Sequence, residues 1–166
     1  MNVLLISEKT LKTDSLINDN VDSSYIFPAI QVAQDQGLQS IIGTKLYKRI
    51  CNDVENDSLT EDYKTLLDEY ITPYLEFQVM SDIQIPLSYK FRNLGMNQAN
   101  DDHTYNLSMR DIQYLVNYYG NKAKFYSNRL YDFLVTNCSK YTEFRKKDSG
   151  IDLMSNKQSY KTNIVL

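Results

Sequence analysis

Tryptophan is absent from the sequence, and histidine, cysteine and proline are scarce, with one, two and three residues among 166. The two cysteines, Cys51 and Cys138, lie far apart and belong to no CxxC or Cys/His cluster, so neither a zinc site nor a disulfide framework is indicated. Glycine-rich phosphate-binding motifs of the GxxxxGKS/T and GxGxxG types are also missing. We therefore expect a protein that holds no metal and no cofactor.

Long apolar runs are missing as well. The opening segment MNVLLISEKT contains too short an apolar stretch for a signal peptide. No later run approaches the roughly 18 apolar residues of a membrane-spanning helix. These absences predict a soluble, unexported protein that makes no contact with a membrane.

The sequence offers few groups suited to catalysis. His103, the single histidine, lies in the polar stretch DDHT, and no nucleophile motif stands at a readable spacing from it. The best carboxylate cluster lacks a histidine or a further ligand for a metal-dependent nuclease, and its members are Glu61, Asp62, Asp68 and Glu69. The pattern predicts a protein without enzymatic activity.

Charge is distributed unevenly along the chain, whose formal net charge is −3. This balance disfavours a protein held on nucleic acid by phosphate contacts, but not one that merely surrounds DNA. Acidic residues predominate from Asp53 to Asp82, and basic residues predominate toward the end of the region from Lys90 to Lys147. Opposite patches suit a head-to-tail ring, in which two different surfaces of one protein meet, although a charged face is more often simply solvated. The interface candidates from these segments are Asp57, Glu61, Asp68, Glu69, Lys122, Lys124, Arg129, Arg145, Lys146 and Lys147.

Apolar residues recur at helical spacing through most of the chain. In the first half, a brief helix after Ser7 precedes a longer helix that starts near Asp22 or Ser23 and stops at Gly43. We expect Thr44 to be the N-cap of the helix that follows. The spacing therefore predicts three consecutive helices before the polar connection that ends at residue 60.

The second half contains the longest helical pattern. A helix that begins after Thr60 is expected to break or bend sharply at Thr72 and Pro73, because proline lacks a backbone donor. Residues 89–93 alternate as in a short strand, and residues 95–106 are typical of an exposed loop or hairpin. The longest helix is predicted from a Ser108 cap to about Thr136.

These elements predict a mainly α protein, a compact bundle of about four to five helices with a small extended or β-hairpin insertion before the long last helix. Residues 1–137 are expected to form the helical domain, and residues 138–166 a C-terminal tail or arm. The fourteen tyrosines and six phenylalanines suit both a core and surfaces buried on assembly. In the tail, Tyr141, Phe144 and Tyr160 are candidates for clasping a neighbouring protein.

Three segments resemble the head-tail connector proteins of tailed bacteriophages, the adaptor rings below the portal in crAss-like and related virions. The segment PAIQVAQDQGLQSIIGTKLYKRI resembles a recurrent segment of that family. YKTLLDEYITPYLEFQVMSDIQIPLSYKFRNLGM looks like the middle of the family, and LVNYYGNKAKFYSNRLYDFL is similar to its long closing helix. The resemblance covers about Val3 to Leu134 in the right order, and its fixed residues include Pro28, Gly43, Tyr47 and Pro73.

The resemblance implies an α-helical virion protein, assembled in the host cytoplasm, that forms a dodecameric ring with copies of itself at the head-tail interface. Its implied partners are the portal protein and the next ring or tail protein. Genomic DNA would pass through the lumen without sequence-specific binding, and an acidic or neutral lumen helps because it repels phosphate. The alternative hypothesis is a cytosolic helical adaptor or regulator that binds a protein partner through its Tyr-rich helices.

Overall fold

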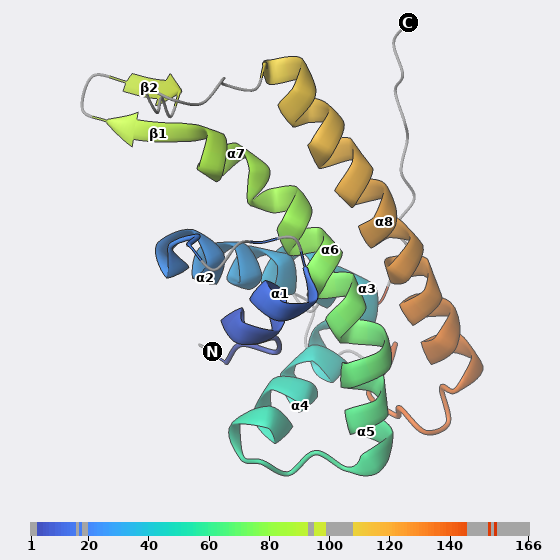
Figure 1. Ribbon diagram of the computed structural model, residues 1–166. Coiled ribbons are helices and arrows are strands. Elements are labelled where there is room, and N and C mark those ends of the chain that lie inside the picture. The colour runs from blue at the N-terminus through green and yellow to red at the C-terminus, as the bar shows by residue number, and fades with distance from the viewer. Residues whose placement is uncertain are drawn as a thin grey trace, which may run out of the picture.

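The computed structural model describes residues 3–15, 17, 20–92, 95–98, 108–145, 153 and 155. The structure is mainly helical, which confirms the predicted fold class (Figure 1). The first half contains α1 (Glu8–Asp14), α2 (Ser23–Val32), the π-helical segment η1 (Ala33–Leu38), α3 (Gln39–Ile42) and α4 (Thr44–Glu55). The second half contains α5 (Glu61–Leu66), the π-helical segment η2 (Leu67–Ile71), α6 (Thr72–Asp82), α7 (Gln84–Ser88), β1 (Tyr89–Arg92), β2 (Gly95–Gln98) and α8 (Met109–Thr136).

The helices of the first half begin close to the predicted caps. Ser7 caps α1 and Asp22 caps α2, and each side-chain oxygen accepts a hydrogen bond from a backbone N–H of the first turn. The helical run from α2 to α3 ends at Gly43, whose φ of 84° is a conformation that favours glycine. Both expectations, the starting cap and the glycine stop, are confirmed.

The predicted role of Thr44 is wrong. Gly43 occupies the N-cap position of α4, and Thr44 is already the first helical residue. The Thr44 hydroxyl instead accepts from the backbone N–H of Leu153 at 2.9 Å, and the Thr44 N–H donates to the Leu153 carbonyl at 3.0 Å. Thr44 therefore holds a segment that lies 109 residues later in the sequence.

The expected break at Pro73 does not occur. Residues 61–82 are helical without interruption through α5, η2 and α6. A proline ring in a regular helix clashes with the carbonyl four residues earlier, here that of Glu69. The π-helical turn η2 ends just before Thr72 and changes the spacing of these carbonyls, so that Pro73 enters the first turn of α6.

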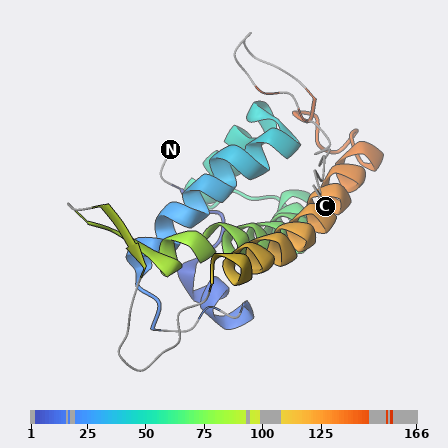
Figure 2. The same cartoon turned by 90° about the horizontal axis from the view of Figure 1, so that it is seen from above.

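Helix α6 lies at the centre of the molecule. In two views at right angles, α2 lies on one side of α6 and α8 on the other (Figures 1 and 2). Both α2 with η1 and α8 pack against α6. Fully buried aliphatic residues from all three regions form one core, including Ile30, Leu38, Leu75, Val79 and Leu130.

Two short strands follow α7. β1 and β2 pair antiparallel, with Tyr89 opposite Gln98 and Arg92 opposite Gly95. The predicted loop over residues 95–106 falls only partly on described residues, because residues 99–107 lie outside them. Among the helices that the structure does describe, none combines the length and apolarity that crossing a bilayer requires.

The start of the predicted C-terminal arm belongs to the core. Tyr141 is 1% exposed and Phe144 is 5% exposed, and both pack in the main hydrophobic cluster. The Tyr141 hydroxyl donates to the backbone carbonyl of Asp62 at 3.0 Å, and burial raises the pKa of Tyr141 to about 12. The expectation that Tyr141 and Phe144 clasp a neighbour is therefore wrong, because these rings are already buried within their own chain.

Candidate protein-binding surface on α8

Helix α8 owes its sharp beginning to a capping box. The Ser108 side chain accepts from the Asp111 backbone N–H at 3.3 Å, and the Asp111 carboxylate accepts from the Ser108 N–H at 3.1 Å. Hydrogen bonds from Ser108 lower the pKa of Asp111. The helix continues for 28 residues, a length of about 42 Å at a rise of 1.5 Å per residue.

One face of α8 packs against η2 and α6. Aromatic rings stack across this contact: Tyr70 lies 3.9 Å from Phe133 and Phe77 lies 5.2 Å from Tyr126, measured between ring centroids. The buried residues on this face are Ile112, Ala123, Ser127, Leu130 and Leu134. This packing fixes α8 against the body and determines which of its side chains point away from it.

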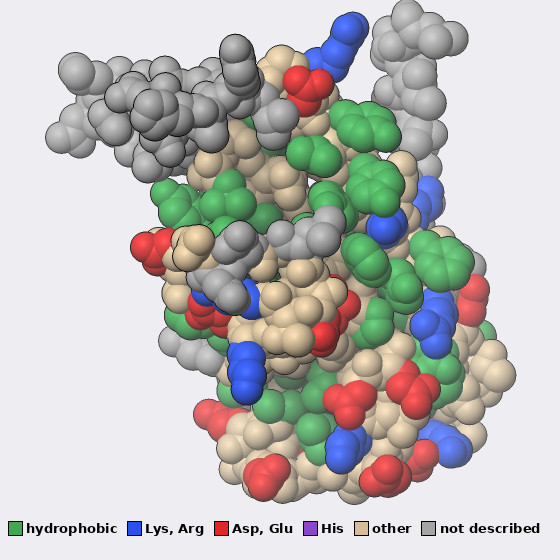
Figure 3. Space-filling view, viewed as in Figure 1, with side chains coloured by type: hydrophobic (Ala, Val, Ile, Leu, Met, Phe, Trp, Pro, Cys, Tyr) green, Lys and Arg blue, Asp and Glu red, His purple; other side chains and the backbone are tan. Residues whose placement is uncertain are grey.

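The outward side of α8 carries three exposed aromatic residues. Tyr114 is 69% exposed, Tyr118 is 44% exposed and Phe125 is 64% exposed. They follow one another at spacings of four and seven residues, so they lie along one side of the helix. Figure 3 shows hydrophobic side chains gathered along this helix, toward the upper right of the view.

An open groove of about 430 Å³ runs beside these rings, between α6 and α8. Lys122 lies in it, with its Nζ 4.6 Å from the ring centroid of Tyr118 and 5.2 Å from that of Phe77. A hydrogen bond with Tyr118 raises the pKa of Lys122. We call Tyr114, Tyr118, Lys122 and Phe125 the α8 face, an aromatic surface with a cation at its centre.

A second hollow of about 210 Å³ continues from the groove toward α1. Asp14 and Glu76 supply carboxylates to its wall, opposite the ring of Tyr119 and the side chain of Lys122. Burial raises the pKa of Glu76, and the nearby charge of Asp14 raises it further. The groove therefore changes character along its length, from aromatic and basic to acidic.

The acidic interface candidates lie on the surface around α5. Glu61, Asp68 and Glu69 are exposed on α5 and η2, and Asp57 is exposed in the turn before α5. Among the described residues, no group of three or more histidine, cysteine or acidic side chains is arranged to hold a metal ion. The described part of this region is an acidic surface whose carboxylates do not converge on a metal-binding site. His103 lies outside the described residues.

Two basic side chains near the C-terminal end of α8 contact the α5–η2 region. The guanidinium of Arg129 lies 4.8 Å above the ring of Tyr70, which neighbours Glu69. Lys140 forms an ion pair with Asp62 at 2.9 Å. The fold thus brings the segment after α8 against α5 at this ion pair, while the use of opposite charged patches between neighbouring copies stays a prediction.

The remaining candidates are placed as follows. Lys124 lies half-buried on α8, one turn from the groove. Arg145 is exposed, and its guanidinium donates to the hydroxyl of Tyr131 at 3.0 Å. Lys146, Lys147 and Tyr160 lie outside the described residues.

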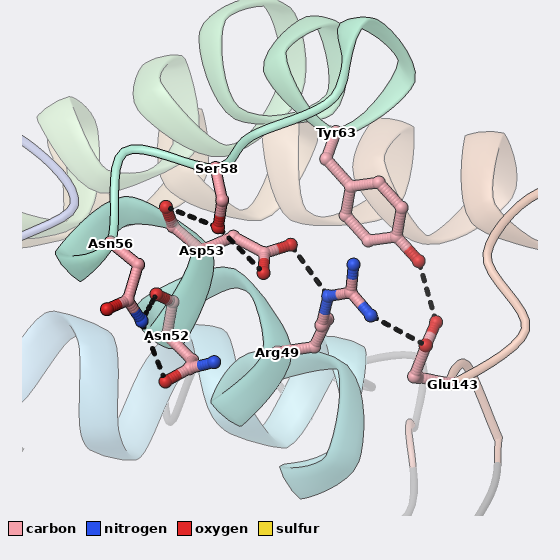
Figure 4. Close-up of polar contacts among 7 residues, drawn as sticks. All are labelled: Arg49, Asn52, Asp53, Asn56, Ser58, Tyr63 and Glu143. Carbon is pink, nitrogen blue, oxygen red and sulfur yellow. Dashed lines mark hydrogen bonds and ion pairs between the residues drawn. The ribbon is translucent and has the colours of Figure 1, made fainter.

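A polar network joins α4, α5 and the turn after α8 (Figure 4). Arg49 forms an ion pair with the buried carboxylate of Asp53 at 2.6 Å, and this hydrogen bond raises the pKa of Arg49. Its other side faces Glu143 at 3.9 Å, and Glu143 accepts from the Tyr63 hydroxyl at 2.6 Å. Ser58 also bonds Asp53, which fixes the turn before α5.

The network is a structural contact between distant parts of the sequence. Burial raises the pKa of Tyr63, and its hydrogen bond to Glu143 raises it further. For Glu143, burial acts to raise the pKa, but the Tyr63 hydroxyl, backbone and Arg49 together lower it. Arg49 lies over the ring of Tyr63, 5.5 Å from its centroid. This arrangement keeps Tyr63 protonated and Glu143 ionised. The hydrogen bond between them therefore serves to join α5 to the turn after α8.

Residues 38–152 match the model of DUF6712, described as a family of unknown function. The chain belongs to this family. The DUF6712 region includes both the α8 face and the Arg49 network, together with the turn that buries Tyr141 and Phe144. No curated protein and no solved structure matches the chain.

Sequence reasoning missed most of the α8 face in this DUF6712 protein. Of its four residues only Lys122 is among the charge-based candidates. The missing signal is positional. Tyr114, Tyr118 and Phe125 lie off the apolar stripe that recurs along this helix at spacings of four and three, whose members are Ile112, Val116, Tyr119, Ala123, Tyr126, Leu130 and Phe133. Large aromatic residues outside a buried stripe mark a surface that a partner can cover.

Proposed function

We propose that the chain is a virion structural protein that forms an adaptor ring between portal and tail and extends the DNA channel. The observation that supports this most is the α8 face, a row of exposed aromatic side chains on a helix that is rigidly held from behind. Tyrosine and phenylalanine are enriched in protein interfaces, where their rings exchange water for a partner surface. The resemblance to head-tail connectors supplies the assembly to which this surface would belong.

The exposed acidic residues have a role in the same proposal. A ring that conducts DNA needs a lumen to which phosphate does not adhere, and carboxylates meet that need by repulsion. Asp57 is exposed in the turn before α5, and Glu61, Asp68 and Glu69 are exposed on α5 and η2. We therefore propose the α5 region as the lumen side, with DNA passing it without sequence-specific contacts.

Reconstitution with the portal tests the proposed function. The purified chain is mixed with the portal protein of the same phage, separated by size, and imaged by negative-stain electron microscopy. A ring added to one end of the portal is the expected result. If the chain does not comigrate with the portal at any ratio, the connector proposal is wrong.

A second candidate is a helical adaptor that binds a protein partner inside the cell through α8. The same exposed rings favour it, because a single partner would cover Tyr114, Tyr118 and Phe125 as well as a neighbouring copy does. The two functions differ in what is recovered with the chain from infected cells. Capture of portal and tail proteins favours the ring, whereas capture of one other protein without virion components favours the adaptor.

A further inference from the structure

The chain carries a second exposed apolar surface on the far side of α6 from α8. On α2, Phe27 is 45% exposed and Val32 is 42% exposed, with exposed Pro28 between them. Pro28, Val32 and Asp35 follow one another at spacings of four and three, which places them along one side of the helical run. Phe27 lies five residues before Val32, about 140° around the helix, so these two residues form opposite edges of the exposed side of α2. We call Phe27, Pro28, Val32 and Asp35 the α2 face. Figure 3 shows hydrophobic side chains near α2 and α7, at the left of the view.

The two faces carry opposite charge. Between residues 13 and 44 the sequence contains no lysine or arginine, and the described charges there are Asp14, Asp22 and Asp35. Between residues 112 and 131 it contains no acidic residue, and the charges are Lys122, Lys124 and Arg129. Of these acidic residues only Asp35 belongs to the α2 face, where it is exposed and accepts a hydrogen bond from the Tyr47 hydroxyl, whereas Asp14 lies in the hollow that Lys122 also lines. The negative charge of Asp35 suits the positive charge of Lys122 on the α8 face.

The two faces also lie on opposite sides of the subunit. Both α2 and α8 pack against α6 from different sides (Figures 1 and 2). Neighbouring subunits in a twelve-membered ring differ by a rotation of about 30°, so their two contact surfaces must lie nearly opposite each other. A two-fold dimer would instead need one surface that is complementary to itself.

We propose that the α2 face of one copy docks on the α8 face of the next. In this contact Phe27 and Val32 cover the rings of Tyr118 and Phe125, and Asp35 approaches Lys122. The inference rests on the proposed ring function, and it adds the surfaces through which the subunits meet. It uses surfaces other than the acidic α5 region and the basic segment after α8, where Lys140 already pairs with Asp62 within one chain.

Cysteine cross-linking of the full chain tests this contact. Cys138 is exposed and is replaced by serine, whereas Cys51 is buried and stays. Two variants then carry Phe27→Cys or Phe125→Cys, and circular dichroism checks that each is folded. With a short bismaleimide linker, we expect a mixture of the two to give heterodimers, and a chain with both changes to give a ladder of larger species.

A matched control replaces Phe27→Cys by Glu69→Cys, which is exposed on η2 and away from α2. Heterodimer yield no higher than with this control would overturn the inference, as would Phe125→Cys linking to itself as well as it links to Phe27→Cys. Lys122→Glu should lower the yield on the order of tenfold, in line with the loss of an interface anchor. Asp35→Lys in the other chain should then restore much of it, because the reversed pair again brings opposite charges together.

The outcomes separate this inference from the proposed function. Ring formation on the portal without a yield above the control means that the subunits meet through other surfaces, so the inference fails while the function stands. Cross-linked ladders from a chain that never joins the portal have the opposite meaning: the contact exists, but in an assembly other than the connector.

Discussion

At the residue scale, the Lys122 side chain is positioned on the α8 face by two aromatic rings. Its ammonium group lies over two aromatic rings, those of Phe77 and Tyr118, and one of these is itself exposed. A cation held over ring faces retains its charge while its stem covers apolar surface. The groove therefore presents a positive charge and aromatic surface together. Because the Lys122 side chain is already positioned over these rings, it loses little conformational freedom when a partner binds.

Gly37 provides a sharp test of the packing between η1 and α6. A Cβ at this position would collide with the hydroxyl of Tyr74, whose ring is fully buried and has no room to move. We expect Gly37→Ala to lower the free energy of unfolding by about 1–3 kcal/mol, the usual cost of overpacking. Urea denaturation followed by circular dichroism measures the change.

The matched control is Gly120→Ala in α8. A Cβ there would lie 3.5 Å from Ser81 Oγ, an ordinary contact, and alanine is favoured over glycine in a helix by about 1 kcal/mol. This variant should be as stable as the natural chain or more so. Equal behaviour of the two variants would contradict the close approach of η1 to Tyr74.

Glu76 gives a pH-dependent prediction. Because burial raises its pKa, the folded protein holds this proton to higher pH than the unfolded chain does, and stability falls as pH rises through that range. Glu76→Gln removes this loss. The variant should gain stability at pH 7 and gain little at pH 3, where Glu76 is protonated in both states.

Thermal unfolding of both proteins across this pH range gives the comparison. The gain should be modest, since Glu76 is only half-buried and solvent screens its charge. Glu69→Gln, at an exposed position, controls for the loss of one negative charge. A gain that is the same at pH 3 and pH 7 would assign the effect to packing instead of to the carboxylate.

At the scale of elements, the turn after α8 matters more than its position near the C-terminus suggests. Tyr141 packs edge-on against Tyr63 with ring centroids 5.4 Å apart, and Glu143 bonds the hydroxyl of the same tyrosine. Residues 141–144 thus close the side of the bundle formed by α4 and α5. The helical core ends at Phe144, seven residues beyond the predicted boundary at residue 137.

Two truncations test this boundary. A chain that ends at Arg145 keeps Tyr141 and Phe144, whereas one that ends at Cys138 loses both. Removing a single buried aromatic side chain commonly costs about 3–5 kcal/mol, so we expect the shorter chain to be less stable by at least about 3 kcal/mol. Calorimetry that finds equal melting temperatures would show that the turn does not support the core.

Local signals predicted the elements that local interactions determine. Ser7, Asp22 and Ser108 each satisfy backbone donors within three residues, and the helices after them begin where the sequence analysis expects. The Ser108 cap and the regular apolar spacing likewise predicted α8 from end to end. The candidate site was harder to predict from the sequence. Periodicity identifies which residues of a helix are buried, but it does not tell whether the exposed residues bind a partner.

The elements that were predicted wrongly depend on distant partners or on altered helical geometry. The partner of Thr44 is Leu153, and the partner of Tyr141 is Asp62, each more than 70 residues away in the sequence. At Pro73, the π-helical turn η2 allows a helix that a proline rule would end. Sequence spacing along one helix contains no information on either kind of contact.

At the scale of the whole molecule, the fold places two apolar faces on opposite sides of one central helix. The α8 face is aromatic and basic, and the α2 face is apolar and acidic. A subunit of this kind can bind the next copy through the same head-to-tail interface, and repeating that interface can close a ring. The acidic α5 region remains exposed, where the proposed ring needs a surface that repels DNA.

The most direct test of the proposed ring is the amount of this chain in purified particles of the phage from which the proposal derives it. Quantitative mass spectrometry with isotope-labelled peptides gives the ratio of this chain to the portal protein. We predict a ratio near one, because an adaptor ring that matches the portal carries one subunit for each portal subunit. Particles that contain the portal but lack this chain would contradict the account.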